Sequence, residues 1–342
     1  MLYHNNQMVL GIDMGNYNMK TANVCFPSAY MELAGDGNDF EHTITYNGKH
    51  YALGGPRVAQ QEDKGSSEDF LILTQFAIAR ELEANQLPPG TYDIILAATL
   101  PPAYLNIPQK RQSMKQFFRR EFSYRYNGRW YNINISRVYV CPQATAALYA
   151  NVLTDEMHRW AENHLIDPST ARPIDLFQKE PSAILIDIGG GTVDIVMLRY
   201  GVPQPFNNDF PAKGVIWTYG AIQQEAKAQL GMDISEEAIN MFLNGEPVRI
   251  GEDAAQIIRK QVSLYANRLL MTLREKQLPF STAYVLLLGG GACLVRKTWT
   301  KLASSFAKLD FLNEIKAIAM GSEVMTQRTL ELQEQRKKSK VR

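Results

Sequence analysis

The chain has 342 residues, of which 45% are apolar and 21% charged, a composition typical of globular proteins that excludes a disordered or low-complexity chain. This length is too great for one ordinary core, so we expect two domains. The 36 Lys and Arg residues nearly balance the 35 Asp and Glu residues, which excludes a global field that would attract nucleic acid or an anionic membrane.

The cysteines and the first residues predict a protein of the reducing cytoplasm. Cys25, Cys141 and Cys293 form no Cys-x-x-Cys pair, so neither a disulfide framework nor a zinc site is expected. The first eight residues lack the basic start and apolar core of a signal peptide. No apolar run approaches the roughly 20 residues that cross a bilayer, so we expect no membrane segment.

The first element in chain order is an expected hairpin over residues 8–27. An apolar strand leads to Asp13, Gly15-Asn16 forms a turn, and the chain returns through Lys20. A carboxylate at this strand end can hold the water shell of a metal ion, while the turn amides and Lys20 can meet phosphate oxygens. The alternative is a surface hairpin in which Asp13 and Lys20 are solvated.

The next stretch predicts an insertion, a helix, a buried strand and a basic helix. Residues 32–64 are polar, and Asn47-Gly48 between alternating residues indicates a strand pair that lies outside the central sheet. Apolar residues recur at helical spacing over 69–87, and 93–100 is a continuous apolar strand. We interpret the basic helix, 109–120, as a solvated face rather than a binding patch.

A short strand followed by an alanine-rich helix is expected over residues 138–150. Pro142 lies at the helix start, where no N–H is needed, and Gln143 falls in the first turn. The small side chains allow close packing against a neighbour, so we expect this helix to connect two domains. Taken alone, Gln143 would be interpreted as a solvent-facing side chain.

Residues 183–194 form the motif around which the chain is organised. An apolar strand, typical of burial on both faces, runs into Asp187, three glycines, a threonine and a second aspartate. Glycines let a turn bring its N–H groups against an anion without obstruction by Cβ. Strands that lead to glycines also occur at 9–20 and 285–291, so we interpret this motif as a phosphate-binding hairpin.

The rest of the chain after this hairpin is mainly helical. We expect Ser235 to be an N-cap and Gly231 and Gly245 to end helices. A long amphipathic helix has Tyr265 on its apolar side. The expected helices cover about 220–231, 235–245, 252–275 and 295–308. The final residues are mostly cationic and are expected to fray.

Taken together and in order, these motifs resemble those of the actin, Hsp70 and sugar-kinase ATPase superfamily. Met320-Gly321-Ser322 resembles its second connecting helix. Within the superfamily, the chain is most similar to the bacterial and archaeal actin-like proteins of the plasmid-partitioning, ParM-like group. The motifs that carry the resemblance are Asp13-Met14-Gly15 with Lys20, Gln143 after Pro142, the stretch Asp187 to Asp194, and Gly289-Gly290-Gly291.

The resemblance implies an α/β, two-domain actin-like (ribonuclease H-like) fold with a nucleotide cleft between the domains. Domain I would contain residues 1–142 and about 310–342, with a small insertion subdomain at about 31–89. Domain II would be residues 143–309, with a helical subdomain at about 220–250.

The resemblance also implies roles for individual residues. Asp13 and Asp187 would hold Mg²⁺ through water, and Gln143 and Asp187 would be catalytic, with Gln143 orienting the attacking water. Asn16 departs from the hydroxyl residue that eukaryotic actin and Hsp70 carry there, and the adenine edge has no assigned residues. The nucleotide would be bound by Asp13, Gly15, Asn16, Lys20, Gly189, Gly190, Gly191, Thr192, Asp194, Gly289, Gly290, Gly291 and Gly321.

The implied activity is slow, Mg²⁺-dependent hydrolysis of ATP, with GTP left open, by a protein that polymerises for plasmid DNA segregation. The implied partners are further copies of the chain and a DNA-binding centromere adaptor protein, with no direct contact to nucleic acid or membrane. A small-molecule kinase and a non-polymerising nucleotide-gated scaffold stay open as alternatives. A Rossmann dehydrogenase is disfavoured because Asp194 occupies the third glycine position of that fingerprint, and the sequence has no Walker A motif.

Overall fold

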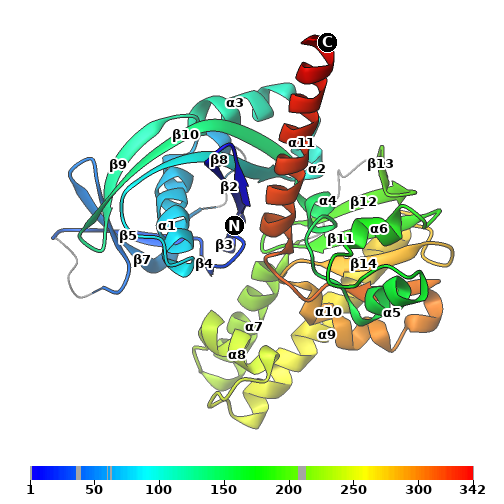
Figure 1. Ribbon diagram of the computed structural model, residues 1–342. Coiled ribbons are helices and arrows are strands. Elements are labelled where there is room, and N and C mark those ends of the chain that lie inside the picture. The colour runs from blue at the N-terminus through cyan, green and yellow to red at the C-terminus, as the bar shows by residue number, and fades with distance from the viewer. Residues whose placement is uncertain (1, 36–39, 60, 62–63, 207–212, 342) are drawn as a thin grey trace. The chain divides into compact units, whose positions relative to one another are not determined.

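The computed structural model describes residues 2–35, 40–59, 61, 64–206 and 213–341 (Figure 1). The chain divides into two compact units, residues 1–176 with 314–342 and residues 177–313. Each unit combines a β-sheet with helices, so the expected α/β class is confirmed. Across the described ranges, none of the helices combines the length and the apolar character that a membrane crossing needs.

The first unit is built on a ten-stranded sheet in the order β4-β3-β2-β8-β10-β9-β6-β7-β5, with β1 paired to β2. β2 and β10 both run parallel to β8, and the other pairs are antiparallel. The strands are β1 (Leu2–His4), β2 (Gln7–Met14), β3 (Asn18–Lys20), β4 (Cys25–Pro27), β5 (Ala29–Leu33), β6 (Thr43–Tyr46), β7 (Lys49–Arg57), β8 (Thr91–Leu100), β9 (Glu121–Tyr126) and β10 (Arg129–Pro142).

The strands between residues 29 and 57 continue this sheet, so the expectation that they lie outside it was wrong. β6 pairs with β9, with Ile44 opposite Tyr126 and Thr45 opposite Arg125. The predicted Asn47-Gly48 turn does join β6 to β7. Turn residues reveal a local hairpin, whereas the partner strand β9 lies far along the chain and leaves no local signal.

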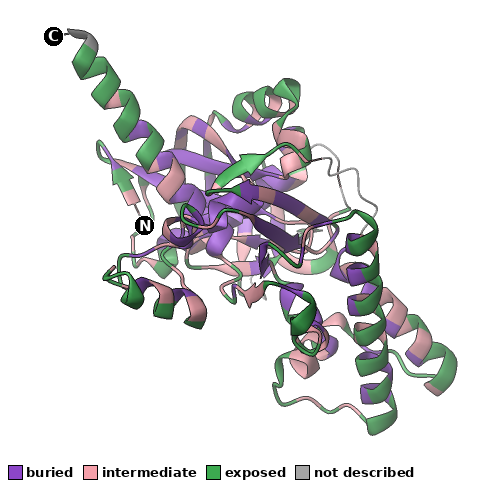
Figure 2. Cartoon of the chain, turned by 90° about the vertical axis from the view of Figure 1, so that its right-hand side faces the viewer, coloured by how far each residue is buried: buried purple, intermediate pink, exposed green. Residues whose placement is uncertain are grey.

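Helices cover both faces of the central strands of this unit. The helices in this part of the chain are α1 (Glu68–Ala84), α2 (Pro102–Leu105), α3 (Pro108–Phe118), α4 (Gln143–Ala147), α5 (Asp155–Asn163), α6 (Pro173–Phe177) and α11 (Ala317–Val341), of which α1 and α11 cover the strands. α1 packs on the face of Leu10 and Leu96, and α11 packs on the face of Val9 and Ile95. Burial of both faces requires the continuous apolar runs of β2 and β8. α11 is largely exposed from Glu331 to Ser339 (Figure 2).

Residues 143–176 belong to the first unit, whereas the expected boundary lay between residues 142 and 143. The small side chains of α4 do allow a close neighbour, as predicted, and that neighbour is α11. A Cβ built on Gly321 in α11 would lie 1.7 Å from the carbonyl oxygen of Ala146. This backbone contact holds α4 within the first unit.

The second unit has a five-stranded sheet in the order β13-β12-β11-β14-β15. β11 and β12 form the predicted hairpin, and β14 and β15 extend the sheet in parallel with β11. The predicted helix ends are confirmed, with Ser235 accepting the N–H of Ala238, and Gly231 and Gly245 in left-handed conformations. The elements are β11 (Ala183–Ile188), β12 (Val193–Arg199), β13 (Val202–Gln204), α7 (Val215–Leu230), α8 (Glu236–Asn244), α9 (Glu252–Glu275), β14 (Tyr284–Leu288), α10 (Ala292–Thr300) and β15 (Lys308–Phe311).

The contact of Gly321 with α4 predicts opposite effects for the same substitution in two helices. Gly321→Ala forces α4 and α11 apart, and we expect it to lower the free energy of unfolding by about 1–3 kcal/mol. Gly220→Ala in α7 adds a Cβ with no atom within 4 Å. It should raise stability by up to about 1 kcal/mol, since alanine favours helix more than glycine does. Thermal unfolding followed by circular dichroism tests both variants, and a stabilised Gly321→Ala would contradict this packing.

Candidate functional site

In the first unit, polar side chains meet where three parallel strands end. Asp13 is 3% exposed, and its Oδ2 accepts a hydrogen bond from Lys20 Nζ at 2.8 Å. Its Oδ1 accepts from Gln143 Nε2 at 3.2 Å and from Thr99 Oγ1 at 3.4 Å. Asp13 is near the end of β2, Thr99 near the end of β8, and Gln143 directly after β10. The carboxyl ends of parallel strands share one edge, which brings these distant segments together.

The hairpin register explains the ion pair between Asp13 and Lys20. The two residues lie opposite each other on β2 and β3, so their side chains share one face of the hairpin. Their side chains are only 4% and 12% exposed. The structure therefore excludes the alternative of a surface hairpin in which both charges are solvated.

The turn after Asp13 contains an amide that the protein does not satisfy. The Oδ1 of Asn16 is buried and accepts no hydrogen bond within the described residues. The turn itself is held by Ser28 Oγ, which donates to the carbonyl of Gly15 at 2.6 Å, and by Lys64 Nζ, which donates to that of Met14 at 2.6 Å. A buried polar atom without a partner costs free energy, so the Asn16 amide is suited to a ligand or water.

The donors around Asp13 fit a hydrated Mg²⁺ better than a directly coordinated ion. Among the described residues, no three His, Cys, Asp or Glu side chains lie close enough to hold a metal. Mg²⁺ usually keeps several waters and binds proteins through one or two carboxylates. A buried carboxylate surrounded by Lys20 and two neutral donors can accept hydrogen bonds from such waters.

In the second unit, Gly189 to Thr192 form a tight loop between β11 and β12. The N–H of Gly189 donates to the carbonyl of Thr192 at 3.0 Å, which closes the loop. Asp187, before the loop, is 6% exposed and lies opposite Asp194 in the hairpin. Thr192 Oγ1 donates to Asp194 Oδ2 at 3.3 Å. Both predicted carboxylates and the hydroxyl therefore belong to one hairpin.

The carbonyl groups of this loop bind the start of α7. The carbonyls of the three loop glycines, Gly189 to Gly191, accept the N–H groups of Val215, Ile216 and Gly214 at 3.2, 3.0 and 3.0 Å, respectively. In a trans peptide, the carbonyl of one residue and the N–H of the following residue point in opposite directions. Because the carbonyls of residues 189–191 point toward α7, the N–H groups of residues 190–192 face away from it. An N–H cluster of this kind suits an anion.

The predicted glycine turn at 289–291 packs against this loop. Gly289 has φ of +84°, and a Cβ on it would lie 2.3 Å from Asp187 Oδ1. The N–H of Gly291 donates to the carbonyl of Ile188 at 2.9 Å. The second unit therefore brings two of the three glycine motifs together, although they are about a hundred residues apart in the chain.

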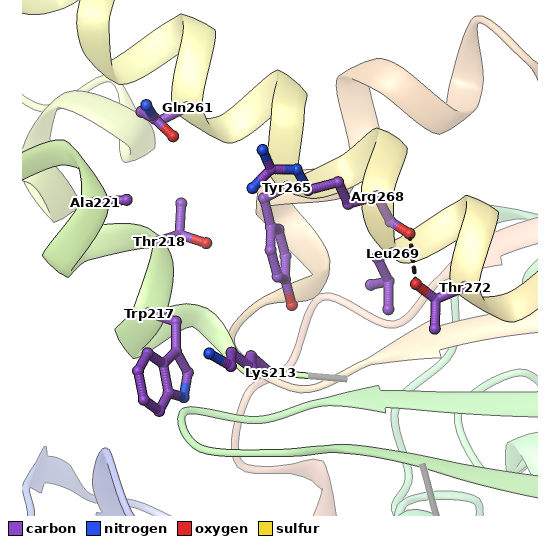
Figure 3. A pocket seen from close by; sticks show the side chains of 9 residues that line it. All are labelled: Lys213, Trp217, Thr218, Ala221, Gln261, Tyr265, Arg268, Leu269 and Thr272. Carbon is purple, nitrogen blue, oxygen red and sulfur yellow. Dashed lines mark hydrogen bonds between the residues drawn. The ribbon is translucent and has the colours of Figure 1, made fainter. Parts of the chain in front are cut away.

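A pocket of about 260 Å³ lies between α7 and α9 (Figure 3). Lys213 Nζ is 3.9 Å from the centroid of the Trp217 ring, at the α7 side of the pocket. The hydroxyl of Tyr265 is buried and has no hydrogen-bond partner within the described residues. Burial raises the pKa of this hydroxyl, so it stays neutral and can donate. The lining residues are Lys213, Trp217, Thr218, Ala221, Gln261, Tyr265, Arg268, Leu269 and Thr272.

The sequence did not predict the pocket or the contact between the start of α7 and the glycine loop. Tyr265 was placed on the apolar side of a long helix, and its hydroxyl carried no signal of a site. Gly214, directly before an apolar helix, was the available signal for close contact with the loop. Gly321 lies within α11 against α4, so the structure shows it in helix packing.

Comparisons with known proteins agree with this architecture. Residues 11–145 match the family model described as the actin like proteins N terminal domain. The archaeal actin homologue Ta0583 in complex with ADP is 16% identical, with 94% of this chain and 100% of that chain covered and a TM-score of 0.65. The actin-like protein Alp7A is 14% identical, with 98% and 99% covered and a TM-score of 0.70. A comparison with curated protein sequences finds no match.

A filament structure is also similar to this chain. The AlfA filament bound to AMPPNP is 13% identical, with 96% of this chain and 99% of that chain covered and a TM-score of 0.57. ParM proteins, including one from Bacillus thuringiensis with AMPPNP, match as well. These similarities confirm the predicted actin-like fold, and the resemblance to the ParM-like group is confirmed with them.

The contact between Gly289 and Asp187 predicts that two adjacent glycines differ in their tolerance of a side chain. Gly289→Ala forces a left-handed residue against a carboxylate, and we expect a loss of about 1–3 kcal/mol of stability. Gly290→Ala is the matched control, because a Cβ there meets no atom within 4 Å. Differential scanning calorimetry measures both. Equal unfolding temperatures for the two variants would contradict this arrangement of the turn.

Proposed function

We propose that this chain, which has the actin-like fold, is a Mg²⁺-dependent ATPase whose nucleotide-bound form polymerises. The observation that carries the proposal is the buried group in which Asp13 contacts both Lys20 and Gln143. Hydrolysis of a phosphoanhydride needs charge neutralisation and a positioned water, and this group offers a cation, a carboxylate and a neutral amide.

Phosphate binding is assigned to both units. In the first unit, Lys20 Nζ and the side-chain N–H group of Asn16 would meet phosphate oxygens, whereas the Asn16 Oδ1, an acceptor, would bind a water. In the second, the N–H groups of residues 190–192 are directed away from α7 and would bind a further phosphate group. We propose that Asp13 and Asp187 hold Mg²⁺ through water, where the ion supplies charge neutralisation at the phosphates.

Gln143 is proposed to orient the attacking water. Its Nε2 donates to Asp13 Oδ1 at 3.2 Å and to Thr99 Oγ1 at 3.4 Å. Its Oε1 can therefore accept a hydrogen bond from water. An amide cannot take up a proton as a carboxylate can, so turnover should be slow. The same amide makes a small-molecule kinase less favoured, because that reaction needs a carboxylate base beside a substrate hydroxyl.

The pocket between α7 and α9 is proposed to bind the nucleotide base. Trp217 offers an aromatic face for stacking, and the Tyr265 hydroxyl offers a hydrogen bond that none of the described residues uses. The lining is continuous with the glycine loop, because Lys213 forms a β-bridge with Thr192. ATP is the proposed substrate, and GTP is the competitor that a binding test must include.

Self-association and cargo complete the proposal. The similarity to the AlfA filament supports a polymer that forms when nucleotide favours one conformation of the chain. Plasmid DNA, reached through a DNA-binding centromere adaptor in the cytoplasm, is the proposed cargo.

The first test measures phosphate release and 90° light scattering together, with ATP and Mg²⁺. We expect scattering to rise and then to decay as phosphate appears. Gln143→Ala should slow phosphate release by about 10²-fold, because water is no longer oriented, while assembly persists. Asp187→Ala should also prevent the decay. Phosphate release without any scattering would show a monomeric enzyme, and assembly without phosphate release would favour the nucleotide-gated scaffold.

The second test concerns the base pocket. Trp217→Ala should weaken binding of a fluorescent ATP analogue by about tenfold, since base stacking contributes roughly 1–3 kcal/mol. Trp130→Ala is the matched control, because Trp130 is similarly exposed (53%, against 55% for Trp217) but lies on β10 in the first unit. Tyr265→Phe, which removes one hydroxyl, should change the ratio of ATP to GTP affinity. If Trp217→Ala and Trp130→Ala bind equally well, the pocket does not hold the base.

A further inference from the structure

One helical region of the first unit carries positive charge only. Between Asp93 and Glu121 the chain has five cations and no acidic residue. Lys110 and Arg120 have local roles, because each lies over an aromatic ring at 4.0 and 4.2 Å from the centroid. The three other cations are exposed.

These three cations, Arg111, Lys115 and Arg119, are spaced four residues apart and define a basic face; the first two lie in α3, and Arg119 is its C-cap. The exposed amides of Gln112 and Gln116 lie beside them on the same side of the helix. Within the described chain, none of the three cations forms an ion pair. The face is therefore rich in donors, and the first unit does not use them.

Local structure explains the basic face only in part: Lys115 lies in the last turn of α3, where the helix dipole favours a cation. Like charges four residues apart repel each other in a helix, and a cation in the first turn, such as Arg111, opposes the helix dipole. Some exposed cations of the second unit do have acidic partners, as in Lys260 with Glu225 at 2.6 Å and Arg259 with Glu252 at 2.8 Å. The cations of the basic face are available to an acidic partner outside the unit.

The complementary charge lies in the second unit. Residues 231–253 contain six acidic residues and a single arginine. Three of the acids, Glu237, Glu246 and Asp253, are exposed and form no ion pair within the described chain, and we call them the acidic edge. The guanidinium of Arg259 lies 5.4 Å from the Phe242 ring centroid, which packs the start of α9 against α8 (Figure 1).

We propose that the basic face of one copy binds the acidic edge of a second copy. This inference rests on the proposed self-association and names the surfaces that perform it. At the rise of a helix, the basic face extends over about 12 Å from Arg111 to Arg119, which is close to the length of the nine-residue α8. An exposed apolar side chain lies near each surface in the sequence: Ile107, 37% exposed, is the N-cap of α3, and Met232, 45% exposed, precedes α8.

The location of the two surfaces sets the kind of assembly. They belong to different units of the chain, so a contact between two copies is heterologous. Each copy then has one free surface of each kind, and repetition of the contact extends an open polymer. The near balance of charge over the whole chain is consistent with positive and negative regions that neutralise each other between copies.

Charge reversal tests the two surfaces separately. Arg111→Glu/Lys115→Glu makes the basic face acidic, and Glu237→Lys/Glu246→Lys makes the acidic edge basic. Each double variant should raise the critical concentration for ATP-dependent light scattering by about tenfold or more, since several exposed pairs become repulsive. Lys179→Glu/Lys301→Glu, an equal charge change at exposed sites elsewhere, is the matched control and should assemble like the wild type.

Mixing the two double variants shows whether the contact is between copies. In an equimolar mixture, each reversed surface meets its complement on the other variant, so scattering should return close to the wild-type level. For the wild type, raising salt from about 0.1 to about 1 M shortens the Debye length from about 10 to about 3 Å and should weaken assembly. Circular dichroism and nucleotide binding by each variant confirm that the monomers are intact.

The outcomes separate this inference from the proposed function. A wild-type protein that never assembles with ATP and Mg²⁺ contradicts the polymer itself. A wild type that assembles, with double variants that assemble equally well, overturns only the assignment of these surfaces. Failure of the mixture to recover also overturns the assignment. A basic face that is needed to shift DNA in a gel, but not for assembly, would identify it as a nucleic-acid surface instead.

Discussion

The hydrogen bonds between the glycine loop and α7 are the interaction on which the second unit depends. The carbonyls of residues 189–191 satisfy N–H groups at the start of the helix, which otherwise would lack partners. Because the same loop packs beside Gly289 and leads through Thr192 to Lys213, one set of contacts positions both glycine turns and one wall of the pocket. The glycine loop, the turn at Gly289 and one wall of the pocket therefore depend on the same set of contacts.

In the first unit, the topology of the sheet brings the polar residues of the site together. β2, β8 and β10 are parallel neighbours, so their carboxyl ends place Asp13, Thr99 and Gln143 at one edge. Both faces of these strands are covered by helices, which keeps the carboxylate in a buried environment. Burial strengthens the pairing of Asp13 with Lys20, since fewer waters screen the two charges. Gly321 contributes indirectly, because it lets α11 hold the helix that begins at Gln143.

The charge distribution would connect these sites to the proposed assembly. The two units carry exposed charges of opposite sign on α3 and around α8, while nearly all of the charge cancels over the chain. Attraction of this kind is weak for each pair and is screened by salt, so it suits contacts that must form and release. A nucleotide that changes the conformation of the chain can then control a contact that depends on several weak pairs acting together.

The sequence by itself determined the hairpins at residues 8–27 and 183–199, the glycine turns, and the caps at Ser235, Gly231 and Gly245. These features depend on neighbours within a few positions, and apolar periodicity and turn residues report such neighbours directly. Only the tertiary structure decided that β6 joins β9, that α4 packs with α11, and that Tyr265 and Trp217 line one pocket. These contacts join residues far apart in the chain, and their geometry depends on how whole elements pack.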